Sequence, residues 1–188
     1  MFRALLFIAM TFTSISAHAQ DCSTPAQRVK MLEYVYTGID RVDAAVANVP
    51  PDQAQYLEKE QKRVMDVTRD IQFGERKRTP EEKAREDQRS DFDWQKLTSN
   101  PYYAAWEIRK ELTNIQDMLK KATTLRDGER IEQEAMEYLN AFDQSFDVQE
   151  KLRRHNDWRE ATRFDTLVSD SLKTILRCMI RLPKPPKR

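Results

Sequence analysis

The sequence contains very little histidine. Only two histidines occur in 188 residues, and His18 lies in an N-terminal segment that we expect to be removed. A Ser-His-Asp triad, a haem attachment of the CxxCH type and a multi-histidine metal site are therefore excluded. The remaining His155 follows two arginines at a predicted helix end, where a cation faces the carbonyl end of the helix dipole. We expect a structural role for His155, with no metal and no cofactor.

Two pairs of carboxylates are the remaining candidates for acid–base chemistry. Glu107 and Glu111 lie one turn apart on a predicted helix, as do Glu134 and Glu137. Neither pair falls on the apolar face of its helix, so we expect both pairs to be solvated. A di-iron bundle needs an inward Glu-x-x-His on each of two helices, which a single histidine cannot supply. We therefore predict no catalytic residues and no enzymatic activity.

Glycine is also scarce, with three residues, whereas charged residues make up 34% of the chain. This composition, rich in Glu, Lys, Arg, Gln and Ala, favours helices over sheets. Residues 75–91 have almost no apolar side chains, and their acids and bases nearly balance. We expect this segment to be a short exposed helix or a mobile linker, and not a nucleic-acid-binding surface.

Residues 1–19 have the three parts of a secretory signal peptide. Arg3 supplies a positive charge, residues 4–12 are apolar, and residues 17–19 (Ala-His-Ala) match the small-x-small pattern of a signal peptidase site. The apolar run is shorter than the roughly 20 residues that cross a bilayer as a helix. We therefore expect a soluble mature chain that begins at Gln20, is periplasmic or secreted, and has no membrane span.

The two cysteines are Cys22 and Cys178. Gln20 and Asp21 precede Cys22 where a lipoprotein has small residues, so we do not expect a lipid anchor. In an oxidising compartment the pair is most simply a disulfide, joining the start of the first helix to the last helix. Closing so long a loop is worth roughly 4–5 kcal/mol in the chain-entropy model. Two free thiols or an intermolecular bond are the alternatives, and no CxxC motif supports redox chemistry.

Apolar residues recur at steps of three and four along the chain, which predicts helices with one apolar seam each. The first helix opens at Pro25 and ends at residues 48–51, and Asp52 with Gln55 forms a capping box for the second. Their short connection predicts that residues 25–73 form an antiparallel hairpin. The seams are Leu32, Val35, Ile39, Val42, Val46 and Val49 in the first helix, and Ala54, Leu57, Gln61, Val64, Thr68 and Ile71 in the second.

The second half of the chain predicts another hairpin, residues 101–155, and a last helix. Asn100-Pro101 opens the hairpin, and Asp157 with Glu160 caps the last helix. The predicted seams are Ala105, Ile108, Leu112, Ile115, Leu119 and Ala122; then Ile131, Ala135, Tyr138, Phe142 and Phe146; and finally Ala161, Phe164, Val168, Ser171, Ile175, Cys178 and Leu182. We therefore predict an all-α fold, an antiparallel four- to five-helix bundle with coiled-coil-like seams. It forms a single domain, residues 20–182, followed by a basic Pro-rich tail, 183–188.

Two features suggest binding surfaces. The aromatic residues near the middle of the chain are either buried by the segment that precedes them or form a partly exposed surface for a protein partner. These residues are Phe92, Trp94, Tyr102, Tyr103 and Trp106. The C-terminal end is basic, without any acidic residue from 171 to 188, and is either simply solvated or touches an anionic surface. Its basic residues are Lys173, Arg177, Arg181, Lys184, Lys187 and Arg188.

One short motif resembles a known family. Leu112-Thr113-Asn114-Ile115-Gln116 is similar to the LTxxQ motif of the periplasmic helical chaperones, but the match covers five residues and does not establish membership. Our main hypothesis is an exported, non-enzymatic protein that binds an envelope protein, as an inhibitor or immunity protein or as an accessory factor of an envelope assembly. The alternatives are a chaperone-like protein, and a carboxylate-based enzyme or small-ligand binder with a pocket lined by inward polar residues such as Gln61 or Thr68.

Overall fold

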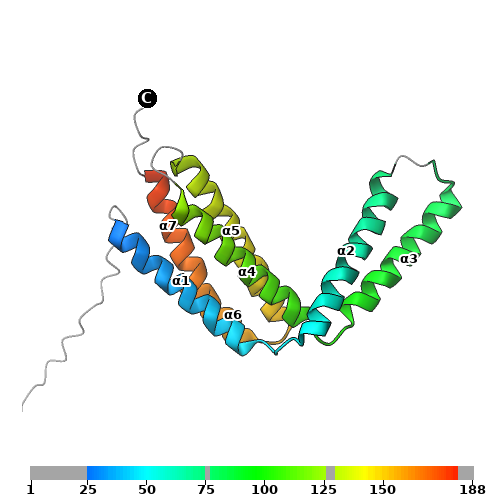
Figure 1. Ribbon diagram of the computed structural model, residues 1–188, viewed down its shortest axis with the longest axis horizontal. Helices are drawn as coiled ribbons and strands as arrows, with labels where there is room; N and C mark the ends of the chain where they lie inside the picture. The colour runs from blue at the N-terminus through cyan, green and yellow to red at the C-terminus, as the bar shows by residue number, and fades with distance from the viewer. Residues whose placement is uncertain (1–24, 75–76, 126–129, 182–188) are drawn as a thin grey trace, which may run out of the picture.

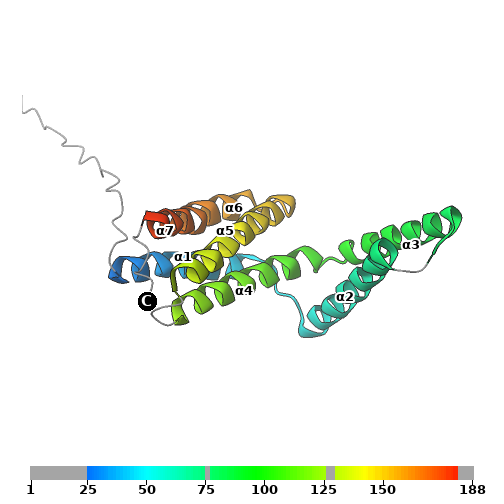
Figure 2. The same cartoon turned by 90° about the horizontal axis from the view of Figure 1, so that it is seen from above.

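The structure, a computed structural model, describes residues 25–74, 77–125 and 130–181. These residues form helices joined by short loops, with no strand among them, so the predicted all-α class is confirmed. The helices form a bundle and an arm that leaves one end of the bundle at a steep angle (Figures 1 and 2). They are α1 (Pro25–Ala45), α2 (Pro51–Phe73), α3 (Pro80–Thr98), α4 (Tyr103–Thr124), α5 (Arg130–Arg154), α6 (Trp158–Phe164), η1 (Asp165–Ser169) and α7 (Asp170–Arg181).

The bundle consists of α1, α4, α5 and the continuous rod α6–η1–α7. The predicted hairpin of residues 101–155 is confirmed, because α4 and α5 pack closely and antiparallel. The predicted seams of α1 and α4 are also confirmed. Their buried members are Leu32, Val35, Ile39, Val42 and Val46 on α1, and Ala105, Ile108, Leu112, Ile115, Leu119 and Ala122 on α4.

The predicted hairpin of residues 25–73 is wrong. In the part of the chain that the structure describes, α2 packs against α3 and not against α1. The reason lies in the loop 46–50, where Pro50 has an extended backbone (φ −57°, ψ 142°) and Pro51 follows it. A residue before proline avoids the helical region, so the loop carries the chain away from α1 instead of reversing it onto the same seam. The α1 seam is then covered by α4 and the last rod.

The two helices of the arm begin differently. The capping box predicted for α2 at Asp52 is absent, because Pro50 occupies the N-cap position and no side chain caps the helix. In α3 a complete capping box forms: the Glu82 backbone N–H donates to Thr79 Oγ1, and the Thr79 backbone N–H donates to the Glu82 carboxylate. Of the two interpretations of residues 75–91, the structure favours the helix, and that helix extends on to Thr98.

The last rod contains a π-helical turn, η1, which corrects its predicted seam. Asp157 caps α6 as predicted, accepting from the Glu160 backbone N–H. Ala161, Phe164, Val168 and Ile175 are buried as predicted, but two of the positions beyond Val168 differ from the prediction. Leu172 and Met179 are buried where Ser171 and Cys178 were expected, and both of the latter are half-buried.

Close packing of η1 on α1 is possible because position 38 is glycine. A Cβ there would lie 2.5 Å from Val168 Cγ2, a separation that carbon atoms cannot adopt. Gly38 therefore lets α1 and the rod approach each other at the π-helical turn.

The inward face predicted for α5 is partly wrong. Tyr138 is buried and Phe142 half-buried, but Phe146 is exposed, and the side chain of Ile131 lies outside the described residues. The true seam steps regularly by four and three and includes two polar residues, Glu134 and Ser145. Those polar positions hid the seam in the sequence. Its buried members are Glu134, Tyr138, Ala141, Ser145, Val148 and Leu152.

Several predictions fall outside the described residues: the signal segment 1–19, Cys22 and the tail 183–188. Cys178 lies half-buried on α7, which packs against α1, and the first turn of α1 and the last turn of α7 lie at the same end of the bundle. The disulfide stays a prediction. None of the described helices has a segment long and apolar enough to cross a membrane.

Candidate functional site

A small hydrophobic cluster, which we call the elbow, joins the arm to the bundle. Its buried residues are Leu57 from α2, Leu97 from α3, and Tyr103 and Trp106 from α4. Half-buried Val49, Ala54, Trp94 and Tyr102 pack around them. Tyr103 and Trp106 point away from the bundle core because they lie opposite the Ala105/Ile108 seam on α4. The elbow is therefore a second core, separate from that of the bundle.

The aromatic residues singled out in the sequence divide between two environments. Four of them, Trp94, Tyr102, Tyr103 and Trp106, belong to the elbow. The fifth, Phe92, is 65% exposed on α3 and lies outside that cluster. Tyr103 and Trp106 have tilted rings with centroids 5.9 Å apart. The structure thus gives most of this group a packing role between α2, α3 and α4, and leaves Phe92 on the surface.

Polar contacts reinforce the elbow. Lys110 Nζ donates to Gln61 Oε1 at 2.7 Å and lies 5.2 Å from the centroid of the Trp106 ring, so one cation on α4 holds both α2 and the indole. Asn100, in the loop between α3 and α4, donates a hydrogen bond from Nδ2 to Gln53 Oε1 of α2 at a distance of 3.5 Å. These contacts connect α2 both to α4 and to the loop between α3 and α4, so they restrict the direction of the arm.

Arg109 fixes the point at which the chain leaves α1. Its guanidinium donates to the backbone carbonyls of Asp43 and Val46 at 3.2 and 3.3 Å, and to Asn48 Oδ1 at 3.2 Å. Arg109 Nε also lies 3.2 Å from Asp43 Oδ1. A cation at the C-terminal end of a helix satisfies the last carbonyls and complements the helix dipole. Arg109 of α4 therefore anchors the end of α1 close to the point where the arm begins.

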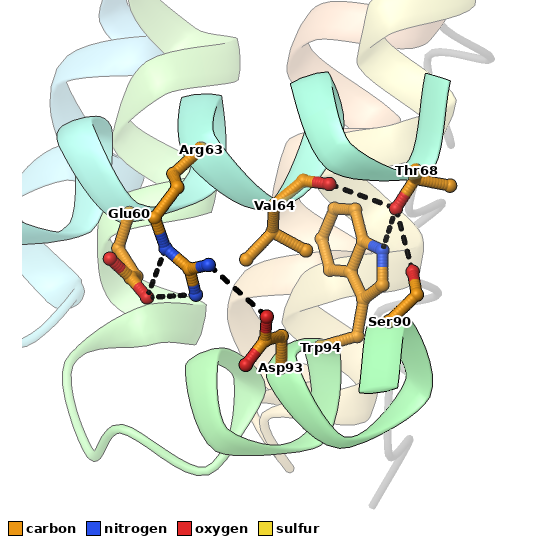
Figure 3. A network of polar contacts seen from close by, with 7 residues as sticks. All are labelled: Glu60, Arg63, Val64, Thr68, Ser90, Asp93 and Trp94. Carbon is orange, nitrogen blue, oxygen red and sulfur yellow. Dashed lines mark hydrogen bonds and ion pairs between the residues drawn. The ribbon is translucent and has the colours of Figure 1, made fainter. Parts of the chain in front are cut away.

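The interface inside the arm is largely polar (Figure 3). Thr68 Oγ1 on α2 accepts a hydrogen bond from Trp94 Nε1 at 3.1 Å, lies 2.8 Å from Ser90 Oγ, and donates to the Val64 carbonyl at 2.9 Å. One hydroxyl thus connects both helices through three partners. Because these buried and half-buried groups satisfy one another, they favour one register of α2 against α3.

Charged pairs extend this interface towards both ends of the arm. Arg63 donates to Glu60 Oε1 at 2.6 Å on its own helix and to Asp93 Oδ2 at 3.1 Å on α3 (Figure 3). The hydrogen bond from Arg63 lowers the pKa of Glu60. Near the tip, Arg78 lies 2.9 Å from Asp70 and 2.5 Å from Glu86, so its guanidinium joins α2 to α3. The arm is therefore held by directional contacts along most of its length.

The surface of the arm carries large apolar side chains that nothing else in the described structure covers. Phe73, the last residue of α2, is 78% exposed at the tip. Phe92 is exposed on α3, and Tyr56 and Met65 are exposed on α2. Tyr56, Met65 and Phe73 were not among the predicted surface residues. The available signal was that all three are apolar and lie off the α2 seam.

The carboxylate pairs are less solvated than expected. Lys151 Nζ on α5 lies 3.1 Å from Glu111 Oε1 and 3.8 Å from Glu107 Oε1, and all three side chains are mostly buried. Tyr103 donates its hydroxyl to Glu107 Oε1 at 3.1 Å. Burial, and then the charge of Glu107, raise the pKa of Tyr103 to about 12. This network ties α4 to α5, so the prediction of a solvated Glu107–Glu111 pair is wrong.

The second pair is also partly corrected. Glu134 is buried on the α5 seam and pairs with Arg28 of α1 at 3.3 Å, whereas Glu137 is half-buried. Burial, and then the charge of Glu134, raise the pKa of the neighbouring Tyr138 to about 12. Three of the four carboxylates that were expected at the surface, Glu107, Glu111 and Glu134, therefore take part in contacts between helices.

The remaining predicted residues take unremarkable positions. His155 is exposed at the end of α5, and Gln61 and Thr68, suggested as pocket residues, are bonded to Lys110 and to Trp94. Lys173 lies 3.5 Å from Asp170, and its ammonium lies over the rings of Phe142 and Phe146. Arg177 is exposed on α7, Arg181 ends that helix, and the other basic-tail residues, Lys184, Lys187 and Arg188, lie outside the described residues.

Comparison with known proteins adds no relative. No protein-family model matches the chain, and neither the curated proteins nor the solved structures contain a significant match to it.

Proposed function

We propose that this protein is an exported, non-enzymatic binding protein that recognises another protein through the α2–α3 arm. The single observation behind the proposal is the arm itself, a two-helix projection whose exposed apolar residues include Phe73 at its tip. Rigid aromatic anchors give much of the binding energy in protein interfaces, because little side-chain entropy is lost when they are buried. The partner is an envelope protein, for which this chain acts as an inhibitor or immunity protein or as an accessory factor.

The internal structure of the arm supports this function. Its helices are held by the Thr68 and Arg63 networks, so its outward apolar residues are not needed to keep the two helices together. In the bundle, by contrast, the large apolar residues of the seams are already buried. The arm therefore has exposed apolar residues that are available for recognition without a cost to its own packing.

The binding experiment compares arm and bundle variants. The double substitution Phe73→Ser/Phe92→Ser removes two exposed rings and is expected to weaken partner binding at least tenfold, because each anchor contributes about 1–2 kcal/mol or more. Recovery of a stoichiometric partner from envelope extract, followed by titration of that partner, measures the effect. The matched control is Met136→Ser/Leu139→Ser, two exposed apolar residues of α5. Equal binding by both double variants would contradict recognition through the arm.

Export is the second part of the proposal. Residues 1–19 act as a cleaved signal peptide, so the mature chain begins at Gln20 and is periplasmic or secreted without a lipid anchor. Intact mass measurement on protein from the native envelope tests this directly, because cleavage after Ala19, retention of the segment and acylation of Cys22 give three different masses.

The same measurement tests the disulfide between Cys22 and Cys178. Bond formation lowers the mass by about 2 Da relative to the reduced chain, and a thiol-alkylating reagent then adds nothing until a reductant is present. Addition of two alkyl groups before reduction would contradict the bond. A disulfide there would fasten the start of α1 to the end of the last rod.

A chaperone-like function is the second candidate. It is favoured by the exposed apolar residues that also occur on the bundle, among them Tyr34, Phe146 and Trp158. Such a protein would suppress aggregation of unrelated denatured proteins at stoichiometric ratios. A specific binder would leave that aggregation unchanged. The Phe73→Ser/Phe92→Ser substitution would then weaken only the binding of the specific partner.

A further inference from the structure

One side of the bundle, which we call the α5–α7 face, is formed by two antiparallel helices, α5 and α7. Figure 2 shows α5 and the rod along one side of the bundle, with α1 and α4 along the other. Among the described residues, the arm packs against α4 and against neither α5 nor α7. No described helix therefore covers the outer surface of this pair.

Apolar side chains form a stripe along the junction of these two helices. The rings of Phe142 and Phe146 meet edge to face with centroids 4.7 Å apart, and Lys173 Nζ of α7 lies 6.0 and 5.8 Å from these centroids. Residues three and four positions apart share one side of a helix, so Leu176 and Ile180 follow Lys173 along the same side of α7. Phe146 is 44% exposed and Ile180 is 80% exposed. The stripe consists of Leu139, Phe142, Phe146, Leu176 and Ile180.

On one flank of the stripe, α5 is acidic. Residues 131–150 contain no lysine or arginine. Asp143 and Asp147 are exposed one turn apart on the outer surface of α5, and Glu150, which is also exposed, pairs with Arg154 at 2.6 Å. The exposed acids of this segment are Glu132, Asp143, Asp147 and Glu150.

On the other flank, α7 is basic. Residues 171–181 contain no acid. Arg177 is exposed, and Lys173 is half-buried over the two rings of α5. Asp170, the residue that begins α7, is exposed and lies 3.5 Å from Lys173. Even with this acid counted, the flank on α7 keeps a positive excess, opposite in sign to the flank on α5.

We propose that the α5–α7 face binds a second copy of this chain in a two-fold symmetric dimer, with α5 of each copy against α7 of the other. The two stripes meet at the centre, and the acids of each α5 lie opposite the cations of the other copy's α7. A surface whose two flanks carry opposite charges is complementary to itself after a two-fold rotation. An acidic or a basic protein would match only one of the two flanks.

The charge pattern also selects the direction of the two-fold axis. An axis parallel to the helices places α5 against α7, whereas a perpendicular axis within the interface places α5 against α5 and opposes like charges. At 1.5 Å per residue, η1 and α7 together are about 25 Å long, and two adjacent helices are about 20 Å wide. This size lies towards the small end of specific interfaces, so we expect a dimer that dissociates at micromolar concentrations.

Both arms leave such a dimer from the same end, because rotation about the helix direction does not exchange the two ends of the bundle. Two arms on one particle bind a multivalent partner more tightly than one arm does. The dimer itself does not depend on recognition through the arm, since the arm takes no part in the α5–α7 face. A single arm keeps its affinity for a monovalent partner, so Met136→Ser/Leu139→Ser remains a control for the arm although Leu139 lies in the stripe.

Sedimentation equilibrium of the chain from Gln20 to Arg188 measures the association. A thiol reductant is present, so that a disulfide between two copies cannot contribute. We expect a reversible equilibrium between monomer and dimer in the micromolar range. A chain that stays monomeric throughout that range would overturn the proposal.

Charge reversal tests the pairing of α5 with α7. Lys173→Glu/Arg177→Glu places acids opposite the acids of α5, and Asp143→Lys/Asp147→Lys places cations opposite the cations of α7, so each double variant is expected to dimerise at least about tenfold more weakly. The variant with all four substitutions has the net charge of the unmodified chain, and its dimer is expected to recover to within about threefold. Failure of the fourfold variant to recover, or full dimerisation by either double variant, would overturn the proposal.

A further variant tests the stripe, and a matched control changes charge on the arm. Ile180→Ser removes an exposed apolar side chain that each dimer contains twice, and it is expected to weaken dimerisation at least about tenfold. Lys59→Glu/Arg85→Glu makes the same charge change as Lys173→Glu/Arg177→Glu at exposed positions of the arm, and it is expected to leave dimerisation within about threefold. Circular dichroism confirms that each variant keeps its helices. Equal weakening by the arm variant and by the α7 variants would overturn the proposal.

Discussion

The bundle and the arm are both helical, but they are held together by different interactions. In the bundle, one continuous apolar core runs from Met31 on α1 to Met179 on α7. In the arm, the buried apolar residues are few, and hydroxyl and guanidinium groups make many of the contacts between α2 and α3. Apolar burial is additive and tolerant of small shifts, whereas hydrogen bonds require defined geometry. The bundle therefore supplies stability, and the arm supplies a defined shape.

The largest expected effect comes from the bundle core. Phe164 is fully buried on α6. The substitution Phe164→Ala is expected to lower the free energy of unfolding by about 3–5 kcal/mol, because it leaves a large cavity. Phe92→Ala removes the same ring from the exposed face of the arm and is expected to change stability by less than about 0.5 kcal/mol. Urea denaturation followed by circular dichroism compares the two. Similar losses would show that the arm and bundle do not differ in this way.

The next effect concerns the elbow. Leu57→Ala in the fully buried position on α2 is expected to cost about 2–4 kcal/mol, but as local opening of the arm and not as global unfolding. Hydrogen exchange should therefore speed up in α2 and α3 while α4 and α5 keep their protection. A uniform loss of protection over the whole chain would mean that the elbow and bundle unfold as one unit.

A smaller effect is expected from the polar network of the arm. Thr68→Val keeps the shape of the side chain but leaves Trp94 Nε1–H without its acceptor, at a cost of about 1–3 kcal/mol. Thr68→Ser retains the hydroxyl and serves as the control. Protection of the arm amides against exchange measures both variants. If the serine variant lost as much protection as the valine variant, the methyl group and not the hydroxyl would be the important part of Thr68.

The smallest effect is a pH dependence in the bundle. Burial raises the pKa of Tyr138 to about 12, whereas tyrosine in an unfolded chain ionises near 10. The protonated phenol therefore contributes stability that is fully present below about pH 10 and is lost as pH rises towards 12, on the order of 1 kcal/mol. Denaturation at about pH 9 and about pH 11.5 should show a smaller decrease for Tyr138→Phe than for the unmodified chain. Equal decreases in stability for the two proteins would mean that a group other than Tyr138 causes the pH dependence.

Much of the fold could be predicted from the sequence. The seams of α1 and α4 were found because their apolar residues repeat without interruption and contact one another in the core. The seam of α5 was found only in part, since Glu134 and Ser145 occupy inward positions that a hydrophobic pattern does not reveal. The inward positions of Leu172 and Met179, on either side of the correctly predicted Ile175, were not found, and the π-helical turn before them leaves no clear pattern in the sequence.

The pairing of helices was harder to predict than the helices themselves. A short loop favours antiparallel packing of the two helices that it joins, but the extended backbone at Pro50 directs α2 away from α1. The polar residues Gln61 and Thr68 on the α2 seam were the available signal, because they required polar partners that the apolar seam of α1 does not offer. For the candidate site, the aromatic residues were recognised as a group, yet most of them are needed to build the elbow.

The anchoring of α1 by Arg109 has a consequence for how this protein can vary. Arg109 holds the carbonyls of Asp43 and Val46, so the chain leaves α1 in a fixed place before the arm begins. After the arm, the chain re-enters the bundle at the start of α4, which is the helix that carries Arg109. The arm is thus an insertion between two neighbouring fixed points. Adding seven residues to α2 and seven to α3 would lengthen it by about 10 Å while leaving both attachment points and the bundle as they are.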